Sequence, residues 1–339
     1  MAKTGQKQDV PADVAGREKI GMRMKSTQQT TLRNRVVVSG GIGVHSGKPV
    51  RLVLNPAEAG AGLVFQRTGL ANGVSRRIAA LHSKVTMTDL CTVIGEDGKN
   101  LVATIEHLVA ALRGLNVDNC LIEVDGPETP IMDGSAAAFV EAIDSVGLVS
   151  LDAPRRYIKI LKTVRIEHGR GYSELRPAAS GFRLDVEIDF DNPVVGRQRK
   201  ILELEPQSFR RDLARARTFG FLSDVEKLTK MGFALGASLE NSVGIDGDRI
   251  LNPEGLRYVD EFVRHKMLDA VGDLALAGAP LIGAYQSYCG GHKMNVAVLD
   301  ALFADKKAWR FVDAPVPHRE GARADLGLAV GPAFMPERN

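Results

Sequence analysis

The strongest constraint on the fold is a pattern of strands and helices that ends near residue 150 and then starts again. A helix predicted over residues 136–146 stops at Gly147, and Pro154 keeps the chain extended at the end of the segment 151–154. Both halves run in the order strands, helix, strand, helix, although no residue-level repeat accompanies this order. We therefore predict two similar α+β domains.

The first half is predicted to open with a β-branched strand over residues 35–39 that enters a turn at Gly40-Gly41. Residues 101–115 predict a helix, because apolar residues recur there at helical spacing, and Thr104 is a plausible N-cap. The remaining strands of this half are predicted over residues 50–54 and 120–124.

The second half predicts a longer helix over residues 260–277, which Gly278 and Pro280 end. Residues 181–190 alternate between apolar and polar side chains, as a half-buried strand does. The other predicted elements are a strand over residues 157–166, a strand that ends at residues 218–221, and a final helix over residues 295–303.

Size and composition permit two domains with sizeable cores, since 44% of the 339 residues are hydrophobic. We place the first domain at residues 29–152 and the second at residues 153–322. A polar tail, predicted to be disordered, covers residues 1–28, and a C-terminal tail covers residues 323–339.

Charge and cysteine content argue against several classes of protein. The net charge of +3 suits an anionic small molecule but is too weak to indicate nucleic acid, and aromatic residues make up only 5% of the chain. No run of about 18 apolar residues and no signal-peptide core is present, so we expect no membrane span. Cys91, Cys120 and Cys289 are odd in number and include no close pair, which predicts a cytoplasmic protein without disulfides.

Three short motifs could carry chemistry. His265 and Asp269 are four residues apart on a predicted helix, so both can ligate one cation such as zinc, and Asp273 extends the same stripe. The competing interpretation is a solvated polar face. Nearby apolar residues of the same helix argue mildly against it.

The dipeptide Glu106-His107 could supply a carboxylate and a metal-bound imidazole, but it also fits a first-turn Glu that complements the helix dipole. His292 follows two glycines that allow close backbone approach, which predicts a loop at a site. By itself His292 also fits an ordinary core or surface histidine. Cys289 and His292 have no second pair, which argues against a structural zinc site.

Six stretches carry a resemblance to a known family: GIGVHSGKPVRLVLNPA, TIEHLVAAL, DGPETPIMDGSA, ARTFGF, RYVDEFVRHKMLDAVGDLAL and GGHKMN. Their order and spacing resemble those of the UDP-3-O-acyl-N-acetylglucosamine deacetylases, zinc amidases at the committed step of lipid A biosynthesis in Gram-negative bacteria. The resemblance covers about residues 28–320. It implies two two-layer β/α sandwich domains, inserts at roughly residues 67–100 and 220–252, and an active site between the domains.

The resemblance also assigns roles to individual residues. His107, His265 and Asp269 match the zinc ligands, although this ligand set could also accept ferrous iron. Glu106 matches the general base and His292 the catalytic histidine. Asp273 matches the carboxylate partner of His292, and Thr218 matches a residue that contacts the oxyanion. Either Glu106 or His292 could protonate the leaving amine.

The implied substrate is a nucleotide-sugar lipid, and no obligate protein partner is implied. Lys266 and Phe219 match substrate contacts, with Lys266 facing the diphosphate. Leu222, Val225 and Leu239 are candidates for an apolar acyl passage, with core packing as the alternative. The chain departs from the family pattern at Gly69, where an acidic residue is common, and at Gly244, where a bulkier apolar residue is expected; Gly244 could widen or loosen the passage.

Three rival interpretations remain at this stage. Another zinc amidohydrolase, acting on a different acetylated amino sugar or a peptide, would use the same metal residues. A nucleic-acid-binding protein would show strongly salt-dependent RNA binding and no role for Glu106. An inactive relative is the third, and the presence of every expected site residue argues against it.

Overall fold

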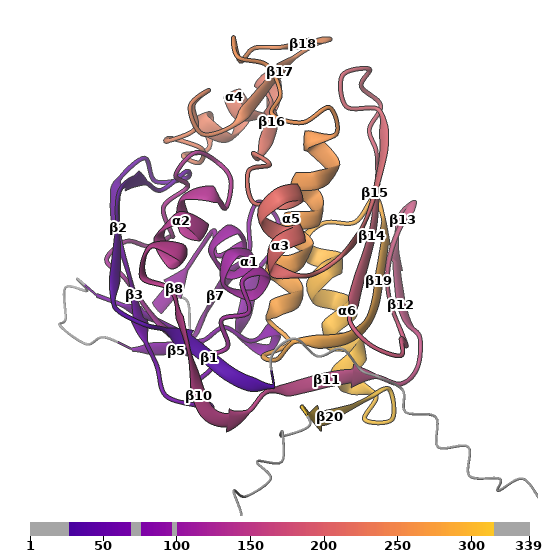
Figure 1. The fold of residues 1–339 in the computed structure, drawn as a ribbon. Helices are drawn as coiled ribbons and strands as arrows, with labels where there is room; N and C mark the ends of the chain where they lie inside the picture. The colour runs from indigo at the N-terminus through magenta and orange to yellow at the C-terminus, as the bar shows by residue number, and fades with distance from the viewer. Residues whose placement is uncertain (1–26, 69–75, 97–99, 315–339) are drawn as a thin grey trace, which may run out of the picture.

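The computed structural model describes residues 27–68, 76–96 and 100–314. Within these ranges two large sheets lie on opposite sides of the molecule, and the helices of the two halves meet between them (Figure 1). The protein is therefore of the α+β class, as predicted. No helix in the described ranges is long and apolar enough to cross a membrane. All three cysteines are free thiols.

The first large sheet has five strands in the order β2-β3-β9-β4-β5, antiparallel except for the pair β4 and β9. Burial alternates along the central strand β9, so one face packs on the core and the other is partly solvated. The strands are Val36–Ile42 (β2), Pro49–Pro56 (β3), Leu63–Arg67 (β4), Arg77–Ala79 (β5) and Cys120–Val124 (β9).

Strand β2 continues through Gly40 and Gly41, where a turn was predicted. The register of β2 against β3 shifts between Val38 and Gly41, which is a β-bulge. Gly41 is required by packing, since a Cβ there would lie 2.5 Å from the side chain of Pro130. The glycine pair therefore marks a bulge and a close contact.

The helices of this half are α1 (Glu106–Gly114) and α2 (Ala137–Val146). Every residue of α1 is buried. The prediction of a helix over residues 101–115 was too long at its start, because residues 100–102 form strand β8 instead. Thr104 is not the N-cap: its φ is +57°, and its carbonyl oxygen accepts a hydrogen bond from the Thr129 hydroxyl. Thr104 therefore makes a long-range contact with Thr129 and does not cap the helix.

A small antiparallel sheet of three strands forms in the range predicted for the first insert and extends two residues past its predicted end. Its strands are β6 (Val85–Met87), β7 (Val93–Glu96) and β8 (Asn100–Val102), and a 3₁₀ turn, η1 (His82–Lys84), precedes them. Residues 69–75, which include the departure noted at Gly69, lie outside the described residues.

The two halves are joined by an extended segment. Strand β10 (Leu148–Pro154) pairs antiparallel with β1 (Gln28–Leu32) and leads directly into the second half. Strand β1 begins at the last residue of the predicted N-terminal tail. Residues 1–26 of that tail and the whole of the predicted C-terminal tail lie outside the described residues.

The second large sheet has seven strands, in the order β12-β13-β19-β11-β20, with β14 beside β19 and β15 beside β14. The single strand predicted over residues 157–166 is in fact two strands, β11 and β12, which occupy different places in this sheet. The strands are Arg156–Ile160 (β11), Val164–His168 (β12), Gly171–Arg176 (β13), Phe182–Asp189 (β14), Arg197–Glu203 (β15), Leu281–Tyr288 (β19) and Trp309–Asp313 (β20).

Helices α5 (Glu261–Ala275) and α6 (His292–Ala304) pack on the second sheet. Helix α5 matches its prediction within two residues at either end. A short helix α3 (Pro206–Ser208) and a π-helical turn η2 (Phe209–Leu213) follow β15, and neither was predicted.

The range predicted for the second insert forms a small unit of its own (Figure 1, top). Strands β16 (Phe219–Phe221), β17 (Val243–Asp246) and β18 (Arg249–Ile250) form a sheet, and α4 (Leu222–Lys230) packs on it.

Helices α1 and α5 cross at close range in the middle of the molecule. Gly272 makes this crossing possible, because a Cβ there would lie 2.1 Å from the carbonyl oxygen of Glu106. A glycine at this point lets the two backbones approach. The crossing brings one helix of each half together.

Candidate metal centre and active site

Helix α5 contributes His265 and Asp269 to a buried polar cluster. Their four-residue spacing places both on one face, with His265 Nε2 3.3 Å from Asp269 Oδ1. The two residues are only 1% and 2% exposed, so this stripe is not a solvated face. Buried polar groups require partners, and the facing helix supplies one.

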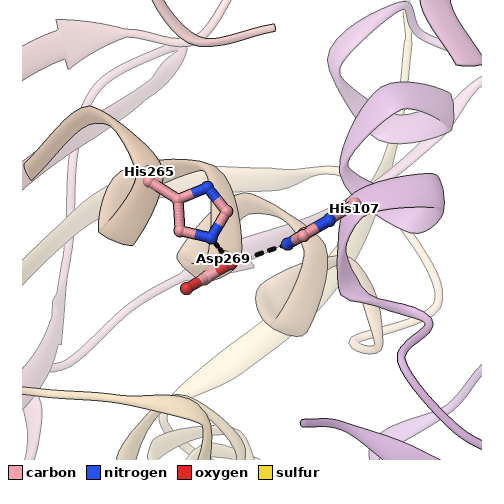
Figure 2. Close-up of side chains that lie close together, drawn as sticks. All are labelled: His107, His265 and Asp269. Carbon is pink, nitrogen blue, oxygen red and sulfur yellow. Dashed lines mark ion pairs between the residues drawn. The ribbon is translucent and has the colours of Figure 1, made fainter. Parts of the chain in front are cut away.

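Helix α1 brings His107 to the same point (Figure 2). His107 Nε2 lies 3.5 Å from Asp269 Oδ1, and one ligand atom from each of the three residues lies within 4.8 Å of the others. Tetrahedral ligands that are about 2.0–2.1 Å from a zinc ion lie roughly 3.3 Å apart, which is close to both separations. Asp269 Oδ1, which faces both rings, has no hydrogen-bond partner among the described residues. These features fit a site for a divalent cation.

The protonation states suit metal binding. Burial lowers the pKa of His265 to about 3, against the opposing effect of Asp269, so the ring is neutral at neutral pH. Its Nδ1 lies 3.0 Å from the Ala216 carbonyl oxygen, which leaves Nε2 facing the cluster. Burial raises the pKa of Asp269, but its interactions with His265, Lys266 and His107 outweigh burial and hold that pKa well below its usual value.

A second cluster lies beside the first. His292 Nε2 is 4.0 Å from Glu106 Oε1, and His292 Nδ1 is 2.8 Å from Asp273 Oδ2. Burial lowers the pKa of His292, but Asp273, Glu106 and Asp269 together raise it to about 9. Burial also raises the pKa of Glu106, although His292 and His107 act against it. His292 is the first residue of α6, where a loop position was predicted.

Two residues that support these groups escaped sequence reasoning. The backbone N–H of Thr92 donates to Glu106 Oε2 at 3.0 Å, and its hydroxyl donates to Asp273 Oδ1 at 2.6 Å. The Asn295 amide donates to Asp273 Oδ2 at 2.8 Å. No local pattern marks Thr92, because its contact with Asp273 joins distant parts of the chain. Asn295 lies in the GGHKMN stretch and could have been found as a neighbour of His292 on one helix face.

Phe219 and Lys266 lie at the edge of the metal cluster, and Thr218 directly precedes Phe219 in the chain. The Phe219 ring is 6.4 Å from the His265 ring, and Lys266 Nζ is 5.7 Å from the Phe219 ring centre. Lys266 Nζ also donates to Asp269 Oδ2 at 2.9 Å, so it contacts a predicted ligand directly. Thr218 precedes Phe219 and is held by backbone hydrogen bonds to Gly134 and Val243.

The predicted acyl-passage residues lie on the small unit of β16–β18. Leu222 and Val225 belong to α4, and Leu239 follows that helix. Leu222 and Leu239 are each 39% exposed, so they are not packed in the core. Gly244 of β17 leaves no gap, since a Cβ there would lie 2.8 Å from Leu239 Cδ2. Leu239 therefore occupies the space that a larger side chain would take.

Comparison with known proteins covers most of the chain. The family model for UDP-3-O-acyl N-acetylglycosamine deacetylase (LpxC) matches residues 29–304. Curated relatives from Brucella ovis and Brucella canis, each named UDP-3-O-acyl-N-acetylglucosamine deacetylase, are 49% identical over 292 residues, which is 86% of this chain and all of each relative. A relative of the same name from Brucella melitensis is 48% identical over the same length. The chain therefore belongs to the UDP-3-O-acyl N-acetylglycosamine deacetylase family.

Proposed function

We propose that this chain is a zinc-dependent hydrolase that removes the N-acetyl group of UDP-3-O-(3-hydroxyacyl)-N-acetylglucosamine, giving the free amine and acetate. The observation that carries the proposal is the convergence of His107, His265 and Asp269 between helices of the two halves. The names of the Brucella relatives support the choice of substrate. This reaction is the committed step of lipid A biosynthesis.

The ligand set favours zinc. Two neutral imidazoles and one carboxylate are typical ligands of a catalytic zinc site, which keeps a further position open. The Asp269 oxygen without a hydrogen-bond partner supports occupation by a cation, and ferrous iron is the second candidate. When bound, Zn²⁺ would polarise the acetyl carbonyl and lower the pKa of a water ligand toward neutrality.

Glu106 is proposed as the general base. Its Oε2 is held by the Thr92 N–H, which leaves Oε1 directed toward His292. A buried carboxylate with a raised pKa accepts a proton more readily near neutral pH than an exposed one does. Glu106 would therefore take a proton from the attacking water.

His292 is proposed to act as a cation. Asp273 holds His292 Nδ1 at 2.8 Å, which orients Nε2 toward Glu106 and favours the charged ring. A protonated His292 can stabilise the negative oxygen of the tetrahedral intermediate and donate a proton to the leaving amine. Thr218 would donate a hydrogen bond to the same oxygen. Proton return from Glu106 is the alternative route to the amine.

Substrate contacts would come from the edge of the cluster and from the small unit. Lys266 supplies the nearby positive charge for the diphosphate, and the Phe219 ring lies near both Lys266 and His265. The half-exposed side chains of Leu222 and Leu239 suit an acyl chain, because they leave apolar surface available for contact. We also propose a cytoplasmic location, since all three cysteines are free thiols.

The test compares the wild type with Glu106→Gln, which retains the size of the side chain. Metal content and acetate release from the proposed substrate are measured in both. We expect about one zinc per chain in each protein and a rate loss of about 100-fold or more in the variant. His107→Ala serves as the matched control and should lose the metal.

Three outcomes contradict parts of the proposal. Full activity of Glu106→Gln would remove the general-base role. Zinc binding without turnover of this substrate would favour an amidohydrolase for another acetylated compound. A wild type that binds no zinc when zinc is supplied would refute the ligand set.

A further inference from the structure

Thr92 lies where the small sheet of β6–β8 meets the active site. It directly precedes β7 and is fully buried, and its neighbours Cys91 and Val93 are buried as well. The Thr92 carbonyl oxygen accepts a hydrogen bond from the Ile105 N–H at 3.4 Å, at the start of α1. Packing and this bond therefore hold the Thr92 backbone against the helix that carries Glu106.

Both hydrogen-bond donors of Thr92 are directed at a carboxylate. The N–H donates to Glu106 Oε2 at 3.0 Å, and the hydroxyl donates to Asp273 Oδ1 at 2.6 Å. An ionised carboxylate can only accept, so the hydroxyl hydrogen points to Asp273. Glu106 belongs to the first half of the chain and Asp273 to the second. One residue therefore links a carboxylate of each half.

The bond from Thr92 also determines which way the Asp273 carboxylate faces. Asp273 is fully buried, and its other oxygen, Oδ2, accepts from the Asn295 amide and lies 2.8 Å from His292 Nδ1. Asn295 and His292 both lie on α6, whereas Thr92 holds Oδ1 from the first half. Loss of the hydroxyl would deprive a buried oxygen of its donor, and the carboxylate could then turn relative to His292.

We propose that Thr92 is a positioning residue for the hydrolysis, an inference that rests on the function proposed above. It holds Glu106 and Asp273 relative to each other, and it thereby sets how His292 Nε2 faces Glu106 Oε1, 4.0 Å away. Proton transfer requires groups within hydrogen-bond reach of the reacting atoms, and a misplacement of about 1 Å can cost about 100-fold in rate. The small sheet of β6–β8 then has a role in catalysis, which is to present Thr92.

Two substitutions isolate the hydroxyl. Thr92→Val keeps the branched shape and the N–H that holds Glu106, but it removes the donor to Asp273; Thr92→Ser keeps both donors. Thr31→Val is the matched control, because Thr31 of β1 is also buried and its hydroxyl donates to the Asn119 carbonyl oxygen at 2.9 Å. Zinc content, urea unfolding, and kcat and KM for the proposed substrate are measured in each protein.

We expect Thr92→Val to bind zinc like the wild type and to lose about 10-fold or more in kcat with KM within about twofold, because a hydrogen bond to a charged group is lost. Thr92→Ser should recover most of kcat. Thr31→Val should be destabilised but should keep its kcat. The proposal is overturned if kcat of Thr92→Val lies within about threefold of the wild type, or if Thr92→Ser or Thr31→Val is equally slow.

Crystal structures of the wild type and the Thr92 variants separate this proposal from the proposed function. If the wild type does not hydrolyse the substrate, the proposed function fails, and the structures decide the role of Thr92. We then expect the separation of His292 Nε2 from Glu106 Oε1 to change in Thr92→Val and to be restored in Thr92→Ser; an unchanged separation overturns the proposal. If Thr92→Val does not fold, Thr92→Ala, which also lacks the hydroxyl, takes its place in both comparisons.

Discussion

Replacing Gly272 by alanine should damage the metal centre without touching a ligand. The new Cβ would lie 2.1 Å from the Glu106 carbonyl oxygen, 2.8 Å from its carbonyl carbon and 3.0 Å from its Cα. The shortest of these is about 1.3 Å less than the 3.4 Å at which ordinary contact begins. All three are backbone atoms of α1, which cannot rotate away as a side chain can. The two helices must therefore separate, and His107 moves with Glu106.

The expected effect follows from the tolerance of metal sites. Ligand distances in a working site hold within about 0.2 Å, so a displacement near 1 Å is several times too large. We expect zinc affinity to fall by at least about 100-fold, since even supporting residues cost 10–100-fold when they are lost. Overpacking should also lower the free energy of unfolding of the metal-free protein by about 1–3 kcal/mol.

The assay is a zinc competition titration against a chromogenic chelator, with urea unfolding of the metal-free protein alongside. Gly220→Ala is the matched control, because a Cβ there meets Val225 Cγ2 at 3.5 Å, an ordinary contact. It should bind zinc like the wild type. If Gly272→Ala matched the wild type in both zinc affinity and unfolding free energy, the argument that this glycine sets the helix separation would be wrong.

Three further predictions concern stability and titration. Arg217→Met should lower the free energy of unfolding, measured in urea, by about 3–5 kcal/mol. The reason is that the fully buried Glu261 loses the guanidinium group 2.9 Å away. A loss under about 1 kcal/mol would contradict this prediction. In metal-free protein the His292 ring should titrate near pH 9 by NMR, and Asp273→Asn should bring its pKa down. The pKa of His292 in the folded state lies above its unfolded value, so the stability from the His292–Asp273 pair is complete below about pH 6.5 and is lost as pH rises toward 9. An unchanged dependence of stability on pH in Asp273→Asn would refute this prediction. Zinc at 100 times its dissociation constant should stabilise the fold by about 2.7 kcal/mol in a thermal scan, and no shift would argue that the folded state does not bind zinc selectively.

Elements whose signal is local were predictable from the sequence. Helix α5 was expected over residues 260–277 and occupies Glu261–Ala275, because a long apolar pattern is ended by Gly278 and Pro280. Strand β9 matches its predicted range of 120–124. The pairing of His265 with Asp269 follows directly from helical spacing.

What could not be predicted depends on contacts between distant segments. Thr104 has the side chain of an N-cap, but its φ is positive, its carbonyl oxygen accepts from the distant Thr129, and the helix begins only at Glu106. Gly41 looks like a turn residue, yet it is required by its contact with Pro130. The meeting of His107 with Asp269 depends on the α1–α5 crossing at Gly272, which no local pattern contains. Short motifs singled out the residues of the cluster, family resemblance assigned their roles, and their geometry came only with the fold.

The division of the proposed ligand triad between two helices also determines when it can form in a growing chain. About 160 residues separate His107 from His265, a stretch that takes roughly 8–30 s to synthesise at 5–20 residues per second. Throughout that interval the nascent chain offers only one of the three ligands. Metal capture by all three proposed ligands would therefore await emergence of α5 from the ribosome.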